Sequence, residues 1–139
     1  MNQIKYQLRY ALPMWFVMLI CNFLPDNRFS IKIRGRLAAL ILPGKPKNFT
    51  LGRDVSLLGI DTLFIGGNVY IAKGGWINAL GQITIGNNVL ISPYVILASL
   101  THSYSGIDYS GPSSSSPIKV GDGSWIAAHA TISSGVSIG

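Results

Sequence analysis

The sequence has 139 residues, enough for one domain with a substantial core, and its 48% hydrophobic and 12% charged residues exclude a disordered chain. A net charge of +6 can attract nucleic acid, an anionic membrane face or an anionic ligand. No helix–turn–helix, zinc or stacking-aromatic pattern accompanies this charge, so we expect no nucleic-acid partner. Cys21 is the one cysteine, which excludes an internal disulfide and fits a reducing, cytoplasmic setting.

Residues 1–47 are predicted to form a helical, basic unit. Eight of the eleven basic residues lie there, opposed only by Asp26. Residues 11–24 carry no charge, but this run is shorter than the roughly 20 residues of a membrane-spanning helix, and no signal-peptide cleavage site follows it. We predict a helix that caps the open end of the next domain. A compatible alternative is an interfacial helix that places Trp15, Phe16 and Phe23 in a membrane surface.

A second short helix is predicted after the Pro-Asp-Asn break at residues 25–27, with Asn27 or Ser30 as its N-cap. Apolar residues recur in it at helical spacing, and Arg34 and Arg36 are expected to lie off that stripe. The stripe comprises Ile33, Leu37, Leu40 and Ile41. Pro-Gly-Lys-Pro at residues 43–46 ends the helix and separates it from a second domain.

Residues 48–139 repeat themselves. Residues 63–71 align with residues 83–91, and within each copy an aliphatic residue recurs every six positions. These residues are Ile65, Ile71, Ile77, Ile85, Ile91 and Leu97, and later Val120, Ile126, Ile132 and Ile138. This period is typical of a parallel β-helix, in which three hexapeptides close one coil of about 18 residues. The second and third coils are 20 residues apart, and we expect the two extra residues at the corners before Ile65 and Ile85.

One long segment, residues 98–117, breaks the repeat and carries His102. It is polar and rich in Gly, Pro and Ser. A loop of this length inside a regular solenoid is usually either functional or disordered. Taken alone, His102 is most simply an exposed loop residue, so any role for it depends on the motifs around it.

Three segments in a fixed order resemble the hexapeptide-repeat acyltransferases, most closely the maltose, galactoside and polysaccharide O-acetyltransferase branch. They are residues 85–95, then Thr101-His102, then residues 118–128 with a Trp-Ile pair. The resemblance covers about residues 48–139. It implies an all-β solenoid wound as a left-handed parallel β-helix, with acetyl-coenzyme A as acyl donor. The handedness comes from the resemblance alone.

By position in this resemblance, His102 is the general base that deprotonates an acceptor hydroxyl, which then attacks the acetyl thioester. A neutral imidazole can remove such a proton as the new bond forms. No metal is required, because the thioester is already activated. A zinc-dependent carbonic anhydrase of the same fold is disfavoured, since its metal needs three histidines and this chain has only His102 and His129.

The acceptor site is expected around His102. The resemblance places a polar acceptor contact near Asn78, one coil below the loop. Tyr104 and Asp108 can contact a sugar by stacking and hydrogen bonding, although the loop can equally be a mobile connector.

The donor site is expected on the Trp-Ile coil. The resemblance assigns Trp125, Ala127 and Ala128 to the coenzyme, with the small residues leaving room for its pantetheine arm. His129 is expected at an exposed corner without a catalytic role.

The resemblance further implies a homotrimer with active sites between subunits. We expect the chain to be truncated at its C-terminus, because residues 138–139 open another repeat. The preferred function is O-acetylation of a saccharide, in cell-surface polysaccharide biosynthesis, in the cytoplasm or at the inner face of the membrane. Two alternatives stay open: a sugar N-acetyltransferase of the same fold, and a non-catalytic β-helix scaffold or inactive fragment.

Overall fold

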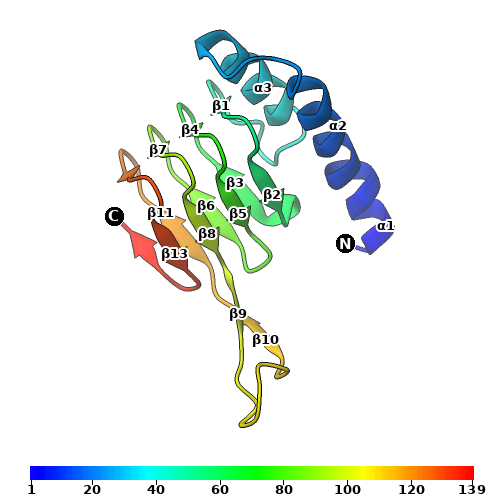
Figure 1. The fold of residues 1–139 in the computed structure, drawn as a ribbon, viewed down its shortest axis with the longest axis vertical. Coiled ribbons are helices and arrows are strands. Elements are labelled where there is room, and N and C mark those ends of the chain that lie inside the picture. The colour runs from blue at the N-terminus through cyan, green and yellow to red at the C-terminus, as the bar shows by residue number, and fades with distance from the viewer.

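Three parallel sheets enclose the core of the repeat domain, and a row of helices lies across one end of it (Figure 1). The computed structural model describes all residues from Met1 to Gly139. Each of the three sheets takes one strand from each of four successive coils. This topology is a parallel β-helix, as the hexapeptide period predicts.

The strands of these sheets are only two or three residues long. The first sheet contains β1 (Thr50–Leu51), β4 (Tyr70–Ile71), β7 (Leu90–Ile91) and β12 (Trp125–Ile126). The second contains β2 (Ser56–Leu58), β5 (Trp76–Asn78), β8 (Ile96–Ala98) and β13 (Thr131–Ser133). The third contains β3 (Leu63–Ile65), β6 (Ile83–Ile85), β11 (Ile118–Val120) and β14 (Ser137–Ile138). Strands this short are stable only because each coil stacks on the next.

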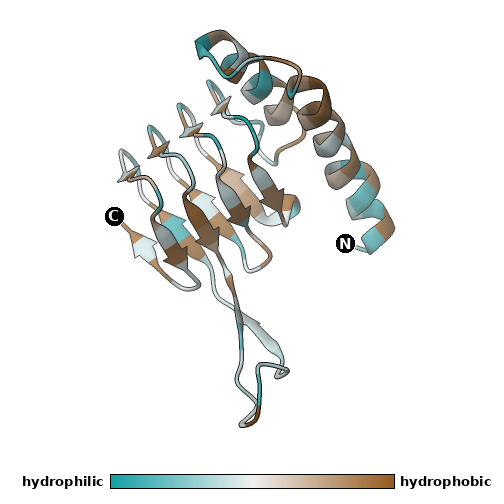
Figure 2. Ribbon diagram, viewed as in Figure 1, coloured by the Kyte–Doolittle hydropathy of each residue, from teal (hydrophilic) through white to brown (hydrophobic).

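The six-residue period places the aliphatic residues inside the coils. Leu51, Ile71 and Ile91 stack in the first sheet and Ile77 and Leu97 in the second, and none of the five is exposed to solvent. They belong to one continuous core cluster of 23 buried residues. Figure 2 shows that the hydrophobic strands are aligned from coil to coil.

The coils differ in length, and the additional residues lie at their corners. In the third sheet, Leu63 pairs with Ile83, which lies 20 positions later in the chain. Ile83 in turn pairs with Ile118, which lies 35 positions later. The extra residues of the first two coils lie between β2 and β3, where the 3-10 helix η2 (Ile60–Thr62) forms, and between β5 and β6. Both positions agree with the corners predicted from the sequence.

Asparagines form a ladder along another corner. Asn48, Asn68 and Asn88 each have a positive φ, between 51° and 58°, which Asn tolerates better than most residues. The Asn48 amide donates to Oδ1 of Asn68 at 3.0 Å, and the Asn68 amide donates to Oδ1 of Asn88 at 3.0 Å. These residues therefore turn the chain at the same corner of three successive coils.

The N-terminal residues fold into a nearly continuous helix followed by a shorter one. Their elements are α1 (Gln3–Tyr6), the π-helical turn η1 (Gln7–Ala11), α2 (Leu12–Cys21) and α3 (Arg28–Ala39). Asn27 is the N-cap of α3, as predicted, and its Oδ1 accepts hydrogen bonds from the backbone N–H groups of Phe29 and Ser30. No helix is both long and apolar enough to cross a membrane.

The face that α3 buries is different from the predicted one. Leu37 and Leu40 of the expected stripe are exposed, and Arg34 is completely buried. Its guanidinium donates to the carbonyl oxygens of Leu51, at 2.9 Å, and Cys21, at 3.2 Å. The cause is what the helix packs against. It covers the first strand, whose carbonyl groups have no preceding coil, so a donor stabilises this contact better than an apolar side chain.

Small residues bring α3 close to the first coil. A Cβ at Gly35 would overlap the backbone of Phe49, and Ala38 and Ala39 are buried beside it. At the other end of the helical row, the Tyr6 hydroxyl accepts hydrogen bonds from the N–H groups of Gly59 and Ile60. The helices therefore satisfy backbone groups of the first coil, which is how a cap contributes to a solenoid.

Candidate active site

The segment that interrupts the repeat forms an arm that extends away from the coils (Figure 1). Its strands β9 (Leu100–His102) and β10 (Ser113–Ser115) pair antiparallel, with His102 opposite Ser113. The Thr101 hydroxyl lies 2.7 Å from the Ser114 hydroxyl across this pair. At the root, the Ser116 N–H donates to the Ser99 carbonyl at 3.2 Å.

His102 is exposed on this arm, where its imidazole has one nitrogen near a hydroxyl. Ser113 Oγ lies 3.4 Å from His102 Nδ1. When Nδ1 carries the proton and donates to Ser113, Nε2 has a free lone pair and can accept a proton from a substrate. In this tautomer, one ring nitrogen of His102 faces a neighbouring hydroxyl and the other is available to accept a proton.

The tip of the arm is held by its own polar groups. Asp108 Oδ1 accepts from the Ser110 N–H and the Ser105 hydroxyl, each at 2.9 Å. Hydrogen bonds from Ser110, through its side chain and its backbone, and from the Ser105 side chain hold the pKa of Asp108 below its usual value. The rings of Tyr104 and Tyr109 lie 5.4 Å apart, and both side chains are exposed. Tyr104 and Asp108 thus share the arm with His102.

Asn78 lies beneath the root of the arm. It ends β5 and is in register with Ala98, which is the last residue of β8 and immediately precedes the arm's root. The Asn78 carbonyl accepts from the Ser99 hydroxyl at 2.7 Å, and its Oδ1 accepts from the Leu80 N–H at 3.2 Å. The expectation that Asn78 lies one coil below the histidine segment is confirmed, and its side chain is only 8% exposed.

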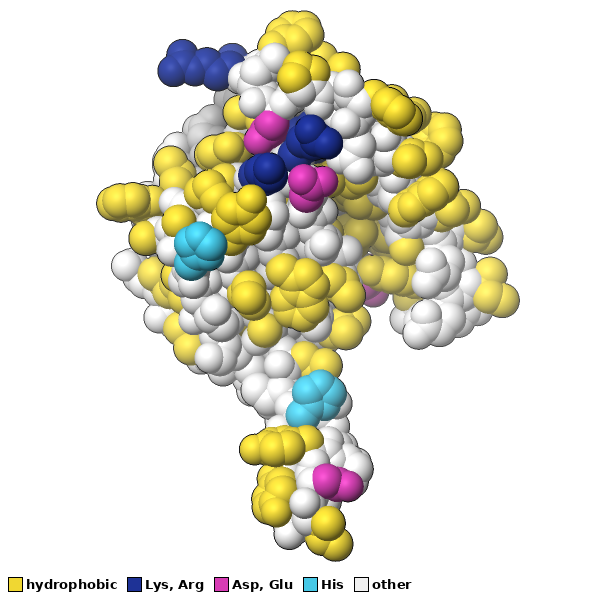
Figure 3. All heavy atoms as spheres, in the orientation of Figure 1, with side chains coloured by type: hydrophobic (Ala, Val, Ile, Leu, Met, Phe, Trp, Pro, Cys, Tyr) yellow, Lys and Arg dark blue, Asp and Glu magenta, His cyan; other side chains and the backbone are white.

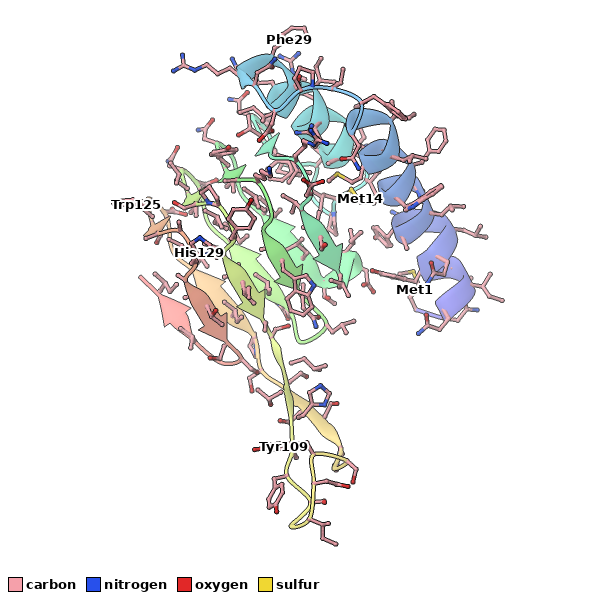
Figure 4. The ribbon with its side chains drawn as sticks, in the orientation of Figure 1. Met1, Met14, Phe29, Tyr109, Trp125 and His129 are labelled. Atoms are coloured by element: carbon pink, nitrogen blue, oxygen red, sulfur yellow. The ribbon has the colours of Figure 1, made fainter.

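The three residues assigned to the donor lie elsewhere on the same chain. Trp125 belongs to the first sheet, whereas the arm leaves the second sheet, and its Nε1 donates to Ser92 Oγ at 2.9 Å. Ala127 and Ala128 are exposed at the following corner. Figure 4 shows Trp125 far from the arm, whose tip is marked by Tyr109. A single copy of the chain therefore does not bring Trp125 against His102.

His129 occupies the exposed corner that the sequence predicted. Its φ is 62°, and its ring stacks on Tyr94 with the ring centroids 5.3 Å apart. The two histidines are well separated on the surface (Figure 3). No group of three His, Cys, Asp or Glu side chains is arranged to hold a metal ion.

Sequence reasoning did not single out the serines that support the site. Ser113 faces His102 across the arm, and Ser99, completely buried, joins Asn78 to the arm's root. The run of four serines at residues 113–116 is a weak signal for an extended strand. Only the register of the hairpin identifies which serine faces the histidine.

Of three comparisons with known proteins, the one with solved structures finds matches. No protein-family model and no curated protein sequence matches the chain. A solved structure of a hexapeptide-repeat-containing acetyltransferase from Vibrio cholerae O1 biovar eltor, complexed with acetyl-coenzyme A, matches with a TM-score of 0.79 and 22% identity. That match covers 99% of this chain and 73% of the other.

Two further solved structures agree. A structure of the Vibrio cholerae acetyltransferase described without the coenzyme has a TM-score of 0.74, with 22% identity over 99% of this chain and 76% of that one. A galactoside acetyltransferase in complex with coenzyme A has a TM-score of 0.55, with 23% identity over 100% of this chain and 68% of that one. The chain has the fold of the hexapeptide-repeat acetyltransferases.

Proposed function

We propose that the protein is an acetyltransferase that moves the acetyl group of acetyl-coenzyme A to a saccharide hydroxyl, with His102 as the general base. The observation that carries this proposal is an exposed histidine on an arm that interrupts a β-helix at one corner. The fold is that of acetyltransferases whose solved structures contain acetyl-coenzyme A or coenzyme A. Left-handed winding of the β-helix is part of the same proposal.

The proposed reaction needs one proton carrier. Nε2 of His102 takes the proton of the acceptor hydroxyl while the hydroxyl oxygen attacks the thioester carbonyl carbon. The carbonyl oxygen becomes an oxyanion, which backbone N–H groups can stabilise. When the carbon–sulfur bond breaks, the imidazolium returns the proton to the departing thiolate. The products are the acetyl ester and free coenzyme A.

The arrangement of the arm favours an active site shared between copies of the chain. His102 is exposed on a projecting hairpin, and Trp125, Ala127 and Ala128 lie on a different part of the surface. In a homotrimer, the arm of one subunit can meet another face of its neighbour. We assign Asn78, Tyr104 and Asp108 to the acceptor and Trp125, Ala127 and Ala128 to the donor.

The proposal gives the two parts of the chain different roles. Residues 48–139 form the catalytic β-helix, and residues 1–47 cover its first coil. The proposed setting is cytoplasmic biosynthesis of a cell-surface polysaccharide, which supplies acceptors rich in hydroxyl groups.

The test is acetyl transfer from acetyl-coenzyme A to a panel of mono- and oligosaccharides, measured by released thiol. His102→Ala should lower the rate by a factor of about 10² to 10⁴, the usual contribution of a general base. His129→Ala is the matched control and should retain the rate of the native chain. Transfer that is unaffected by His102→Ala, in samples shown to be folded and of equal oligomeric state, would refute the assignment. Hydrolysis of the product by mild alkali would identify an ester rather than an amide.

A further inference from the structure

The helices of residues 1–23 have two apolar faces, and the coils cover only one of them. Met14 and Cys21 are buried, and Tyr10 and Met18 pack against the core. A helix that is hydrophobic on every side normally has a partner on every side. The opposite side of α1, η1 and α2 has no partner in this structure.

This uncovered side is a continuous stripe, which we name the outer face. Its exposed residues are Ile4, Leu8, Leu12, Trp15, Phe16, Leu19, Ile20 and Phe23. Most of them follow one another at intervals of three or four, so they share one side of the helix. Figure 3 shows hydrophobic side chains along the free edge of the molecule where α1 and α2 lie. Their exposure ranges from 40% for Leu19 to 86% for Phe23, so this is a large patch for a monomer.

Charge decides what can cover the outer face. Lys5 and Arg9 are exposed in α1 and η1, and Arg28 is exposed at the start of α3. Residues 1–25 contain no Asp or Glu, and Asp26 lies 3.5 Å from the buried Arg34. A second copy of the chain placed on this face would bring like charges together with no acidic partner.

We propose that the outer face binds the surface of an anionic lipid bilayer. The stripe is too short to span a membrane, and its Trp and Phe side chains suit the boundary between headgroups and acyl chains. Lys5, Arg9 and Arg28 then meet lipid phosphates, each contributing electrostatic attraction that weakens with salt. This proposal stands on residues outside the acetyl-transfer site, and it places the enzyme where lipid-linked acceptors are held.

The first test is flotation with vesicles of phosphatidylcholine alone or of equimolar phosphatidylcholine and phosphatidylglycerol. The native chain should bind the anionic vesicles and bind the neutral ones far more weakly. Lys5→Gln with Arg9→Gln should weaken binding by about fivefold per charge removed. Lys73→Gln with Lys119→Gln, which removes the same charge from the coils, is the matched control and should bind as the native chain does. Equal binding to both kinds of vesicle would overturn the proposal.

The second test addresses the apolar stripe. Phe16→Ser with Ile20→Ser should lower vesicle binding by at least about tenfold, because both side chains lose their transfer into the interface. Leu90→Ser with Ile96→Ser, at exposed positions on the coils, should leave it unchanged. An unchanged melting temperature of the helix variant shows that the loss is not unfolding. Vesicle binding that survives Phe16→Ser with Ile20→Ser would overturn the proposal.

The third test measures whether the Trp15 side chain enters the lipid bilayer. In a chain with Trp76→Phe and Trp125→Phe, Trp15 is the single tryptophan. Its emission should shift to the blue on anionic vesicles and be quenched by brominated acyl chains. No shift and no quenching, or a dimer in solution that dissociates in Phe16→Ser with Ile20→Ser, would assign the outer face to a protein partner instead. Acetyl transfer to soluble sugars should be unaffected by Lys5→Gln with Arg9→Gln and by Phe16→Ser with Ile20→Ser, so failure here is distinguishable from failure of the proposed activity.

Discussion

The four coils and the β9–β10 arm are stabilised by different interactions. The coils enclose most of a continuous core of 23 buried residues, with side chains such as Ile71 and Ile91 completely covered. The arm, beyond its root, has no buried residue and is held by hydroxyl and backbone hydrogen bonds such as that between Thr101 and Ser114. Because local opening is governed by buried contacts, the arm can open while the coils remain folded. The proposed general base is therefore located outside the part of the chain that contributes most of the stability.

The largest effect on stability should come from the core of the coils. Ile91→Ala should lower the free energy of unfolding by about 2–5 kcal/mol, because a fully buried side chain leaves a cavity. Leu90→Ala is the matched control, since its side chain points outward and should cost less than about 1 kcal/mol. Chemical denaturation of the two variants measures the difference. Equal destabilisation would contradict the predicted alternation of inward and outward residues.

A smaller effect is expected where the helices meet the first coil. Tyr6→Phe removes the acceptor of the Gly59 and Ile60 N–H groups and should cost about 1–2 kcal/mol. Tyr10→Phe is the control, because the Tyr10 hydroxyl makes no hydrogen bond in the structure and its ring remains. Thermal unfolding compares them. A melting temperature of Tyr6→Phe equal to that of Tyr10→Phe would show that this contact contributes nothing to the cap.

The hydrogen bond between Thr101 and Ser114 should stabilise the arm without affecting the stability of the whole protein. Thr101→Val removes the hydroxyl that contacts Ser114, and we expect the melting temperature to change by less than about 2 °C. Hydrogen exchange at the β9–β10 amides should accelerate several-fold. Thr101→Ser keeps the hydroxyl and should exchange as the native chain does. Global unfolding at a clearly lower temperature in Thr101→Val would mean that the arm and the coils unfold together.

The smallest effect concerns pH and the tip of the arm. Hydrogen bonds from Ser110 and Ser105 lower the pKa of Asp108, so the folded arm favours the charged carboxylate. The Asp108 carboxylate therefore stabilises the folded arm fully above the pKa of an unfolded Asp, about 3.9. This stabilisation is lost as the pH falls through the lower pKa that Asp108 has in the folded arm. NMR titration should show the Ser110 amide shifting in that range. In Ser105→Ala the Asp108 midpoint should move upward, and an unmoved midpoint would remove Ser105 from the explanation.

The coils were largely predictable from the sequence, because one constraint repeats. An inward aliphatic residue every six positions fixes which residues stack, and the pairing of Ile65 with Ile85 follows from it. The extra residues could be located as well, since they must fall where the period is interrupted. The Asn27 cap was predictable for a similar reason, because a short polar side chain before a helix has one common role.

The face of α3 could not be predicted by the same reasoning. Apolar periodicity assumes that a helix packs against apolar side chains, whereas α3 packs against the strand edge of the first coil. There Arg34 reaches the Leu51 carbonyl and Gly35 allows close approach to Phe49. In the candidate site, the location of His102 followed from the interrupted repeat. Its neighbour Ser113 did not, because pairing across a long loop depends on a register that periodicity does not contain.

The corner from which the arm leaves has an evolutionary consequence. Ile83 and Ile118 pair in register although the intervening chain is far longer than in the preceding coil, and Ser116 closes the root on Ser99. The solenoid therefore accepts an insertion at this point without any change in the stacking on either side. A segment of different length or sequence can therefore replace the arm at this corner while the coils stay unchanged, so the arm can diverge between related proteins independently of the scaffold.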